Sequence, residues 1–420
     1  MAPTEIIPDS SPKALKALKA KKAPKAGPSR SVGSALAGAL RGNVRQYGML
    51  VALALIVLLF QIWTDGILLQ PLNITNLIQQ NGYILILAIG MMIVIIAGHI
   101  DLSVGSLAAF VGAAAAVMMV KHHMPWPVAL LAALVIGALA GAWQGFWIAY
   151  LGIPSFIVTL AGMLLFRGGT QIILQGQSVA PFPKGFQSIS SGFLPEVGPH
   201  TDYHNLTLLL GLAVLAVAVL QELRGRRQTA SYGLEVLPLG LFLTKLAVIT
   251  AAVLVFTLLL ASYHGVPIVL LILGALLVGF GYLMRNSIIG RHTYAIGGNE
   301  AAAKLSGVRS KRVVFLAFTN MGVLAALAGL VFAARLNAGT PQAGINFELE
   351  AIAAAFIGGA SASGGVGTVL GAIIGGLVLG VLNNGMSLVG VGTDYQQVIK
   401  GLVLLVAVGF DVYNKRKAGS

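Results

Sequence analysis

Long apolar runs separated by short polar stretches occupy most of this 420-residue chain from residue 47 onward. Several of these runs reach about 20 residues, the length that a helix needs to cross the hydrocarbon core of a bilayer. Only 10% of the residues are charged and 57% are hydrophobic, whereas soluble domains carry about 25% charged residues. The pattern therefore predicts an all-α polytopic membrane protein with about 10 to 12 transmembrane helices, some of them short or broken.

Twelve apolar segments can be placed along the chain, and together they predict one transmembrane domain over residues 47–412. They lie at 47–65, 82–98, 103–120, 127–150, 155–175, 206–222, 240–262, 265–284, 313–335, 349–360, 367–385 and 396–412. Two of the short segments can enter and leave on the same side of the membrane, so the number of full crossings falls between ten and twelve. A basic tail over 1–46, predicted to be disordered, and a short tail over 413–420 flank this domain.

Basic residues are unevenly spread over the polar stretches, and their placement predicts the orientation. Most of the 27 Lys and Arg residues fall in the first 46 residues, around Arg226, in the stretch 285–312 and near the end of the chain. Loops rich in Lys and Arg stay in the cytosol, so we predict that both termini and the 285–312 stretch are cytosolic. A nucleic-acid-binding arm is the alternative for the first tail, but it lacks interleaved aromatic side chains. We therefore predict contact with membrane lipid and none with nucleic acid.

The stretch 285–312 has the features of one short helix. Asn299 is a good N-cap, and Glu300 lies in the first turn, where the helix dipole favours a negative charge. The three alanines that follow are strong helix formers, and Lys304 stands four residues after Glu300. Gly307 can adopt the left-handed conformation that ends a helix. A connecting loop has no need of such a helix unless a partner docks on it.

This stretch resembles the coupling loop of ABC-importer permeases, usually written E-A-A-x-x-x-G. Aligned on Gly307, the pattern covers residues 301–307, and the acidic residue stands one position upstream, at Glu300. The wider string YAIGGNEAAAKLSG is similar to the ribose- and xylose-type branch of these permeases. An ordinary loop helix without a partner remains the alternative for the short motif alone. The resemblance implies that a cytosolic ATPase contacts this helix. The residues of this contact would be Asn299, Glu300, Ala301, Ala302, Ala303, Lys304 and Gly307.

A second string, AGHIDLSVGS over residues 97–106, lies between two apolar segments. Asp101 or Ser103 can cap the following helix, which satisfies amide groups that have no water to turn to. Alternatively, Asp101 contacts the substrate, because a carboxylate within a membrane domain marks a functional site by default. The string resembles the signature G-G-I-D-L-S-V-G-S of the ribose/xylose permease family, which includes Ser106. It departs from that signature by having His99 where glycine is common.

The segment that starts at Pro154 reads PSFIVTLAGM and resembles the P-S-F-I-V-T-L-x-G-M run of the same family. Phe156 and Thr159 are its candidates for a place along the pathway. The polar loop over 175–204 is predicted to be periplasmic, where a partner can dock. We interpret residues 206–262 as an added helical hairpin at the periphery, present in the longer xylose and multiple-monosaccharide permeases but not in the shorter ribose type.

Glycine and serine are concentrated in the C-terminal third, where residues 358–367 read GGASASGGVG. So many glycines in a membrane setting indicate either close backbone packing or an unwound stretch that lines a cavity. Ser361 and Ser363 can offer hydroxyl groups to a polyhydroxylated solute, or they can bond to carbonyl groups nearby. Asn383 and Asn384 belong to a run that resembles the multiple-monosaccharide permeases closely.

Motifs that would give this chain its own chemistry are missing from the sequence. It has no G-x-x-x-x-G-K-[ST] string to hold ATP phosphates, no H-E-x-x-H string and no nucleophile elbow. Cysteine is absent, which excludes a thiolate metal site. We therefore predict a transport subunit without enzymatic activity, cofactor or metal of its own. ATP and Mg²⁺ are predicted to bind to a partner ATPase.

The resemblances imply the permease subunit of an ABC importer for monosaccharides of the xylose, arabinose, glucose and galactose class, in the bacterial inner membrane. They also imply a permease homodimer, a periplasmic sugar-binding protein and an ATPase with two fused nucleotide-binding domains. The alternative is an ion-coupled secondary sugar transporter, which usually needs ionisable residues near the midplane. Asp101, Arg167 and Glu350 are the candidates for such residues. A membrane-embedded transferase is a third possibility, but the sequence shows no acid, base or metal cluster for it.

Overall fold

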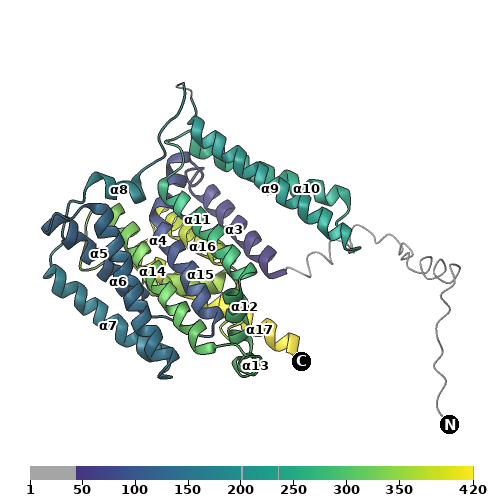
Figure 1. Ribbon diagram of the computed structural model, residues 1–420. Coiled ribbons are helices and arrows are strands. Elements are labelled where there is room, and N and C mark those ends of the chain that lie inside the picture. Colours follow the sequence, from purple (N-terminus) through teal and green to yellow (C-terminus); the bar gives the residue numbers. More distant parts are fainter. Residues whose placement is uncertain (1–43, 200–201, 235, 420) are drawn as a thin grey trace, which may run out of the picture.

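The computed structural model describes residues 44–199, 202–234 and 236–419 (Figure 1). Most of the predicted basic tail therefore lies outside the described residues. Apart from loops and two isolated β-bridges, the described chain is helical. In chain order its helices are α3 (Val44–Trp63), α4 (Pro71–Ile96), α5 (Val104–Ala116), the π-helix η1 (Val117–Lys121), α6 (Trp126–Ala149), α7 (Ser155–Leu174), α8 (Lys184–Ser191), α9 (Asn205–Ser231), α10 (Leu239–Ala261), α11 (Ile268–Asn286), α12 (Ile288–Gly298), α13 (Glu300–Leu305), α14 (Ser310–Leu336), α15 (Phe347–Ile357), α16 (Val369–Leu388) and α17 (Thr393–Gly419).

Nine helices in the described part of the chain are long and apolar enough to cross a membrane: α4, α5 with η1, α6, α7, α9, α10, α11, α14 and α16. The prediction of an all-α polytopic membrane protein is confirmed. The apolar part of α3 is shorter, from Gly48 to Trp63. The short segment at 349–360, for which a full crossing and re-entry were both left open, does not cross as a helix, because the 11 residues of α15 span about 16 Å and the hydrocarbon core is about 30 Å thick. Helix α17 continues to Gly419, so the predicted tail from 413 begins as part of that helix.

Helices α4, α14, α15 and α16 lie together in the middle of the molecule (Figure 1). Small residues at the contacts allow neighbouring helices to pack closely against these four. On α6, Gly137 and Gly141 face Gly322 on α14, and a Cβ on Gly141 would lie 3.0 Å from the Cα of Gly322. In lipid, helices associate through close backbone approach of this kind, because apolar surface gains little by leaving lipid tails. The seam between α6 and α14 is therefore set by glycine positions rather than by large side chains.

Helices α9 and α10 form a separate pair that extends away from the bundle (Figure 1). They occupy residues 205–261, where the added hairpin is predicted. Gly211 on α9 meets Thr257 on α10, and Lys245 Nζ on α10 lies 2.7 Å from Glu222 Oε2 on α9. Most other side chains of the pair are not buried. The hairpin therefore holds together through its own contacts and adds outer surface rather than core.

The chain between α14 and α15 runs back along α5 instead of leaving the bundle. Gly339 approaches Ala116 at the end of α5, and Gly344 approaches Gly105 near its start. A segment made mostly of turns, followed by the short α15, thus replaces one long helix. Such irregular backbone is tolerated at membrane depth only where protein covers it or where it lines a cavity. Helix α15 therefore starts inside the bundle and ends at the glycine-rich turn before α16.

Candidate functional site

The short helix predicted between residues 299 and 307 is present as α13, and its first turn is capped as expected. Asn299 is the N-cap, and its Oδ1 accepts a hydrogen bond of 2.9 Å from the amide of Ala302. Lys304 Nζ lies 2.8 Å from Glu300 Oε1, one turn earlier. Both charged side chains are more than half exposed, so this ion pair stabilises the helix by only about 0.3–0.5 kcal/mol. The cap holds the start of α13 in shape without help from the rest of the fold.

The other end of α13 also stops where the sequence predicts. Gly307 has a φ of +84°, the left-handed conformation that glycine adopts without strain. Its amide donates to the carbonyl of Lys304 at 3.0 Å, and the amide of Val308 donates to the carbonyl of Ala303 at 3.0 Å. These two bonds form a Schellman motif, which satisfies carbonyl groups in the last turn. Both ends of this short helix are therefore fixed by neighbouring residues.

The outward face of α13 is apolar and mostly small. Ala301 and Ala302 are exposed and Leu305 is 91% exposed, whereas Ala303 is 5% exposed and packs toward the rest of the protein. Leu305 was not predicted from the sequence, although its spacing from Ala301 and Ala302 places all three on one side of a helix. A capped helix that presents such a face can insert into a shallow apolar cleft on another protein.

A second helix, α12, was not predicted, and it joins α13 to the bundle. It starts at its N-cap Ser287, whose Oγ accepts a hydrogen bond of 3.0 Å from the amide of Gly290. Burial raises the pKa of Tyr294, so its hydroxyl stays protonated and donates to the carbonyl of Gly367 at 2.8 Å. Its last residue, Gly298, directly precedes the N-cap of α13. Ser287 ahead of an apolar pair was the sequence signal for this helix.

Asp101 and Ser103 belong to a buried polar cluster between α4, α5 and α6. Asp101 Oδ1 accepts hydrogen bonds from the amide of Ser103 at 2.8 Å and from its hydroxyl at 2.6 Å. Gln144 Nε2 donates to Ser103 Oγ at 2.7 Å, and Ser106 Oγ donates to the Ser103 carbonyl at 2.8 Å. Ser103 is the N-cap of α5 but makes no side-chain cap bond. Of the two capping candidates, Ser103 is therefore wrong, whereas Asp101 accepts the amide of the N-cap residue itself.

Asp101 lies buried in the loop between α4 and α5, and this burial favours its protonated form. The residue is 2% exposed. Loss of hydration disfavours the charged form and raises the pKa of Asp101 to about 6, while the hydrogen bonds from Ser103 act in the opposite direction. Asp101 is bonded to Ser103 within the cluster, which favours a structural role for Asp101 over contact with a substrate, although Gln144 Oε1 is buried without a partner among the described residues.

Phe156 and Thr159 lie on different sides of α7. Thr159 is buried and its Oγ1 donates to the carbonyl of Phe156 at 3.4 Å, whereas the ring of Phe156 is exposed. Gly162 lies directly against Gln144 and Ser103. Helix α7 thus contacts the polar cluster through Gly162 rather than through the two residues that the sequence indicated.

Ser361 and Ser363 are directed toward each other within the turn after α15. Their hydroxyl oxygens are 3.0 Å apart, and the amide of Ser363 donates to Ser361 Oγ at 3.3 Å. Asn384 lies elsewhere, on α16, and exchanges hydrogen bonds of 2.8 and 3.0 Å with Asn73 on α4. Asn383 Oδ1 is buried without a hydrogen-bond partner among the described residues. The predicted pathway residues therefore fall into separate clusters and do not meet at one site.

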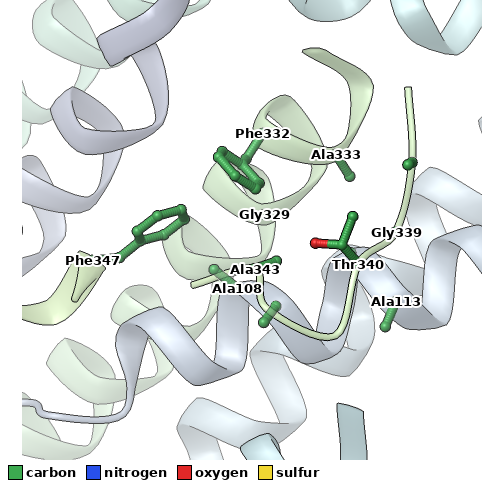
Figure 2. Close-up of a pocket in the computed structure, with 12 residues that line it drawn as sticks. Ala108, Ala113, Gly329, Phe332, Ala333, Gly339, Thr340, Ala343 and Phe347 are labelled. Atoms are coloured by element: carbon green, nitrogen blue, oxygen red, sulfur yellow. The ribbon is translucent and has the colours of Figure 1, made fainter. Parts of the chain in front are cut away.

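A narrow cavity lies between α5, α14 and the segment 338–347 (Figure 2). Alanine and glycine positions form most of its wall, the rings of Phe332 and Phe347 stand at one side, and Thr340 contributes a hydroxyl group. Such a lining offers few hydrogen bonds to a polyhydroxylated solute. The cavity therefore marks a gap beside the returning segment rather than a sugar site.

A charged contact that was not predicted connects α15 and α17. Lys400 Nζ lies 2.9 Å from Glu350 Oε1, and the hydroxyl of Tyr83 on α4 donates to Glu350 Oε2 at 3.5 Å. The Lys400 and Glu350 side chains are 23% and 15% exposed. Charged groups within a membrane domain face protein or water rather than lipid, because lipid cannot solvate them. The partly open side of this pair therefore borders water or another protein surface.

The nine apolar helices, with the short α15 inside the bundle and the capped α13 between α12 and α14, define a polytopic membrane protein among the described residues. Comparison with protein families agrees with this assignment. The family model described as "Branched-chain amino acid transport system / permease component" matches residues 73–408. The chain therefore belongs to this family of transport permease components.

Curated relatives make the similarity more specific. The xylose transport system permease protein XylH of Haemophilus influenzae is 43% identical over 375 residues, which cover 89% of this chain and 98% of that protein. XylH of Escherichia coli (strain K12) is 40% identical over 376 residues, or 90% of this chain and 94% of that protein. The ribose import permease protein RbsC of the same strain is 35% identical over 345 residues, with coverages of 82% and 86%. No solved structure matches the chain.

These comparisons confirm the resemblance to ribose- and xylose-type ABC permeases that the motifs predicted. With the nine apolar helices of the described residues, they also confirm a multi-pass protein of the inner membrane. The orientation of the termini stays a prediction.

Proposed function

We propose that this chain is the membrane-spanning subunit of an ATP-driven importer for monosaccharides. Xylose is the first candidate substrate, and arabinose, glucose and galactose are the others of the same class. The observation that carries the proposal is the 43% identity to XylH over 98% of that protein's length. The similarity to RbsC points to a sugar as well, although the family description mentions branched-chain amino acids.

In this proposal the energy comes from a partner protein. A cytosolic ABC ATPase with two fused nucleotide-binding domains binds ATP and Mg²⁺ and contacts the face formed by Ala301, Ala302 and Leu305. Asn299 and Gly307 keep the helix in the shape needed for this contact. The locally fixed ends of α13 support this role, because a helix that is already ordered loses little entropy when it docks.

Two copies of the chain enclose the pathway, and a periplasmic sugar-binding protein delivers the sugar to it. The central cavity of one copy is narrow and apolar, which supports a pathway between two copies rather than through one. A polar hollow among the loops predicted to be periplasmic includes Glu196, Asp202 and His204 in its lining. In the predicted orientation this hollow is periplasmic, and we propose it as a docking place for the binding protein. Both termini lie in the cytosol in this arrangement.

Uptake of labelled xylose tests the proposal. The chain, its ATPase and its binding protein are expressed in a strain that lacks xylose transport of its own. We expect uptake that requires all three proteins and continues after a protonophore is added, provided that ATP is maintained. Unlabelled arabinose, ribose, glucose and galactose then compete according to the specificity of the system. Uptake that needs no ATPase and stops with the protonophore would support an ion-coupled secondary transporter instead.

A further inference from the structure

A contact made of glycine backbone connects the docking helix to the broken helix at the centre of the bundle. Gly297 and Gly298 end α12, directly before the N-cap of α13, and they lie on Gly364 and Gly365 in the turn between α15 and α16. We call these four residues the glycine junction. A Cβ on Gly365 would lie 2.8 Å from the Cα of Gly298, and a Cβ on Gly364 would lie 2.8 Å from the carbonyl oxygen of Gly297. The two backbones therefore touch directly, without a side chain between them.

Hydrogen bonds fix the junction on both sides. The amide of Gly365 donates to the carbonyl of Ile96, the last residue of α4, at 2.9 Å. The hydroxyl of Tyr294 on α12 donates to the carbonyl of Gly367 at 2.8 Å. Within the turn, the amide of Ser361 donates to the carbonyl of Val366 at 3.0 Å. The turn is therefore an internally bonded unit that is held by α4 and α12 together.

The turn is continuous with two helices that also meet through backbone. Gly371 and Gly375 on α16 face the carbonyl groups of Gly358 and Ala354 on α15. A close contact between backbones cannot absorb a displacement by rotating a side chain, so a shift at one partner moves the other. Through the junction and the turn, α12 is in continuous backbone contact with α15 and α16.

We propose that the glycine junction and Tyr294 transmit the movement of α13 to α15, and that they act as positioning residues for transport. Closure of an ATPase bound at α13 then displaces α12, the turn and the broken helix in sequence. This inference rests on the proposed function, because it requires an ATPase at α13. A contact that served folding alone would affect the amount of assembled protein but not the amount of sugar moved per ATP hydrolysed.

Two variants and two matched controls test the inference. Gly365→Ala places a methyl group against Gly298, and Tyr294→Phe removes only the hydrogen bond to the turn. Gly390→Ala and Tyr282→Phe are the controls. Gly390 has a left-handed φ like that of Gly365 (+76° against +73°) but open space around it, and the ring of Tyr282 is exposed. The complete complex of permease, ATPase and binding protein is placed in proteoliposomes. Co-purified ATPase, ATP hydrolysis and xylose transport are measured for each variant.

We expect xylose transported per ATP to fall about 10-fold in Gly365→Ala, where the junction is overpacked, and about 3-fold in Tyr294→Phe, where one hydrogen bond is lost. The co-purified ATPase should stay at the wild-type amount, and both controls should behave as wild type. If Gly365→Ala fails to assemble, the ratio of xylose to ATP in Tyr294→Phe complexes alone tests the inference. A wild-type ratio of xylose to ATP in assembled Tyr294→Phe complexes overturns the inference. A wild-type permease that binds no ATPase overturns the proposed function, and the inference falls with it.

Discussion

Lys400 Nζ on α17 lies 2.9 Å from Glu350 Oε1 on α15, so the last helix of the chain is tied by charge to the broken helix at the centre. Glu350 Oε2 also accepts a hydrogen bond from Tyr83 on α4, and three helices therefore meet at one carboxylate. The apolar contacts of α17 include Ile399 and Val403 at the edge of a small core cluster and Leu404 against the main one. The ion pair is thus a main contact that holds α17 against α15.

Removing one charge of this pair should destabilise the protein. Lys400→Met leaves Glu350 charged and without its partner, which costs about 2 kcal/mol. This is less than the roughly 3–5 kcal/mol of a fully buried pair, because both side chains are partly exposed. For a protein of this size, we expect the melting temperature of the purified permease in detergent to fall by about 2 °C.

The reciprocal exchange Glu350→Lys with Lys400→Glu is the matched control. It keeps one charge of each sign at the same place, so it should recover more than half of the lost stability. If Lys400→Met melts at the wild-type temperature, the pair does not hold α17, and the contact is incidental.

Helix α13 could be predicted from the sequence because short-range bonds determine it. Asn299 bonds to an amide three residues away, and the Schellman bonds at Gly307 reach back within one turn and a half. The nine apolar spans were predictable for a similar reason, since length and composition decide them. Features of this kind can be predicted from the sequence without knowing which surface they pack against.

The candidate pathway could not be predicted in the same way, because its contacts join distant parts of the chain. Asn73 and Asn384 bond across 311 residues, and no local pattern indicates that pairing. Ser361 and Ser363 were proposed as groups for a solute, but their hydroxyls bond to each other in the turn. The short length of α15 was visible in the sequence, but its place inside the bundle was not, because an apolar composition does not show which helices surround a segment.

Asp101 predicts a pH-dependent stability. Its pKa is about 6 in the folded protein and 3.8 without burial, so the folded state holds the proton more tightly. The stabilising contribution is complete below pH 3.8 and is lost as pH rises through about 6. The loss amounts to about 3 kcal/mol, because each pKa unit corresponds to about 1.4 kcal/mol. Asp101→Asn keeps an oxygen that accepts the Ser103 bonds but does not titrate.

Melting temperatures of wild type and Asp101→Asn, measured in detergent from pH 4.5 to 8, check this prediction. The melting temperature of the variant should rise relative to that of the wild type as pH increases to about 6.5. Above that pH, the difference between the two melting temperatures should stay constant. Ser103→Ala removes a hydroxyl that favours the charged carboxylate, so it should move the same transition to higher pH. A difference between Asp101→Asn and wild type that does not vary with pH would contradict the assignment.

The predicted orientation can be tested with single cysteines, because the natural chain has none. Lys184 at the start of α8 and Arg309 before α14 are both exposed. In intact cells, an impermeant thiol reagent should label Lys184→Cys and should label Arg309→Cys only after the membrane is opened. The cysteine-free wild type is the control for background. Labelling of Arg309→Cys in intact cells would place α13 outside and remove the basis for an ATPase contact there.

The face of α13 should be required for ATPase binding but not for the stability of the permease. Ala302 is exposed, and its amide rather than its side chain bonds to Asn299, so Ala302→Arg leaves the cap intact. Arginine is a good helix former, which keeps the cost to the isolated chain small. Leu305 is 91% exposed, so Leu305→Ala removes almost no packing within the permease. Any large effect of these two changes must therefore come from a partner.

Co-purification of the ATPase and uptake of labelled xylose measure that effect. We expect Ala302→Arg to abolish ATPase binding and uptake, because it adds bulk and charge to an apolar contact. Leu305→Ala should weaken binding about 10-fold, the usual consequence of truncating one apolar anchor. Gln228→Arg, on the exposed end of α9, adds the same charge to another predicted cytosolic site and should have no effect. If Ala302→Arg binds its ATPase and transports as wild type does, α13 is an ordinary loop helix and its capped, apolar face has no partner.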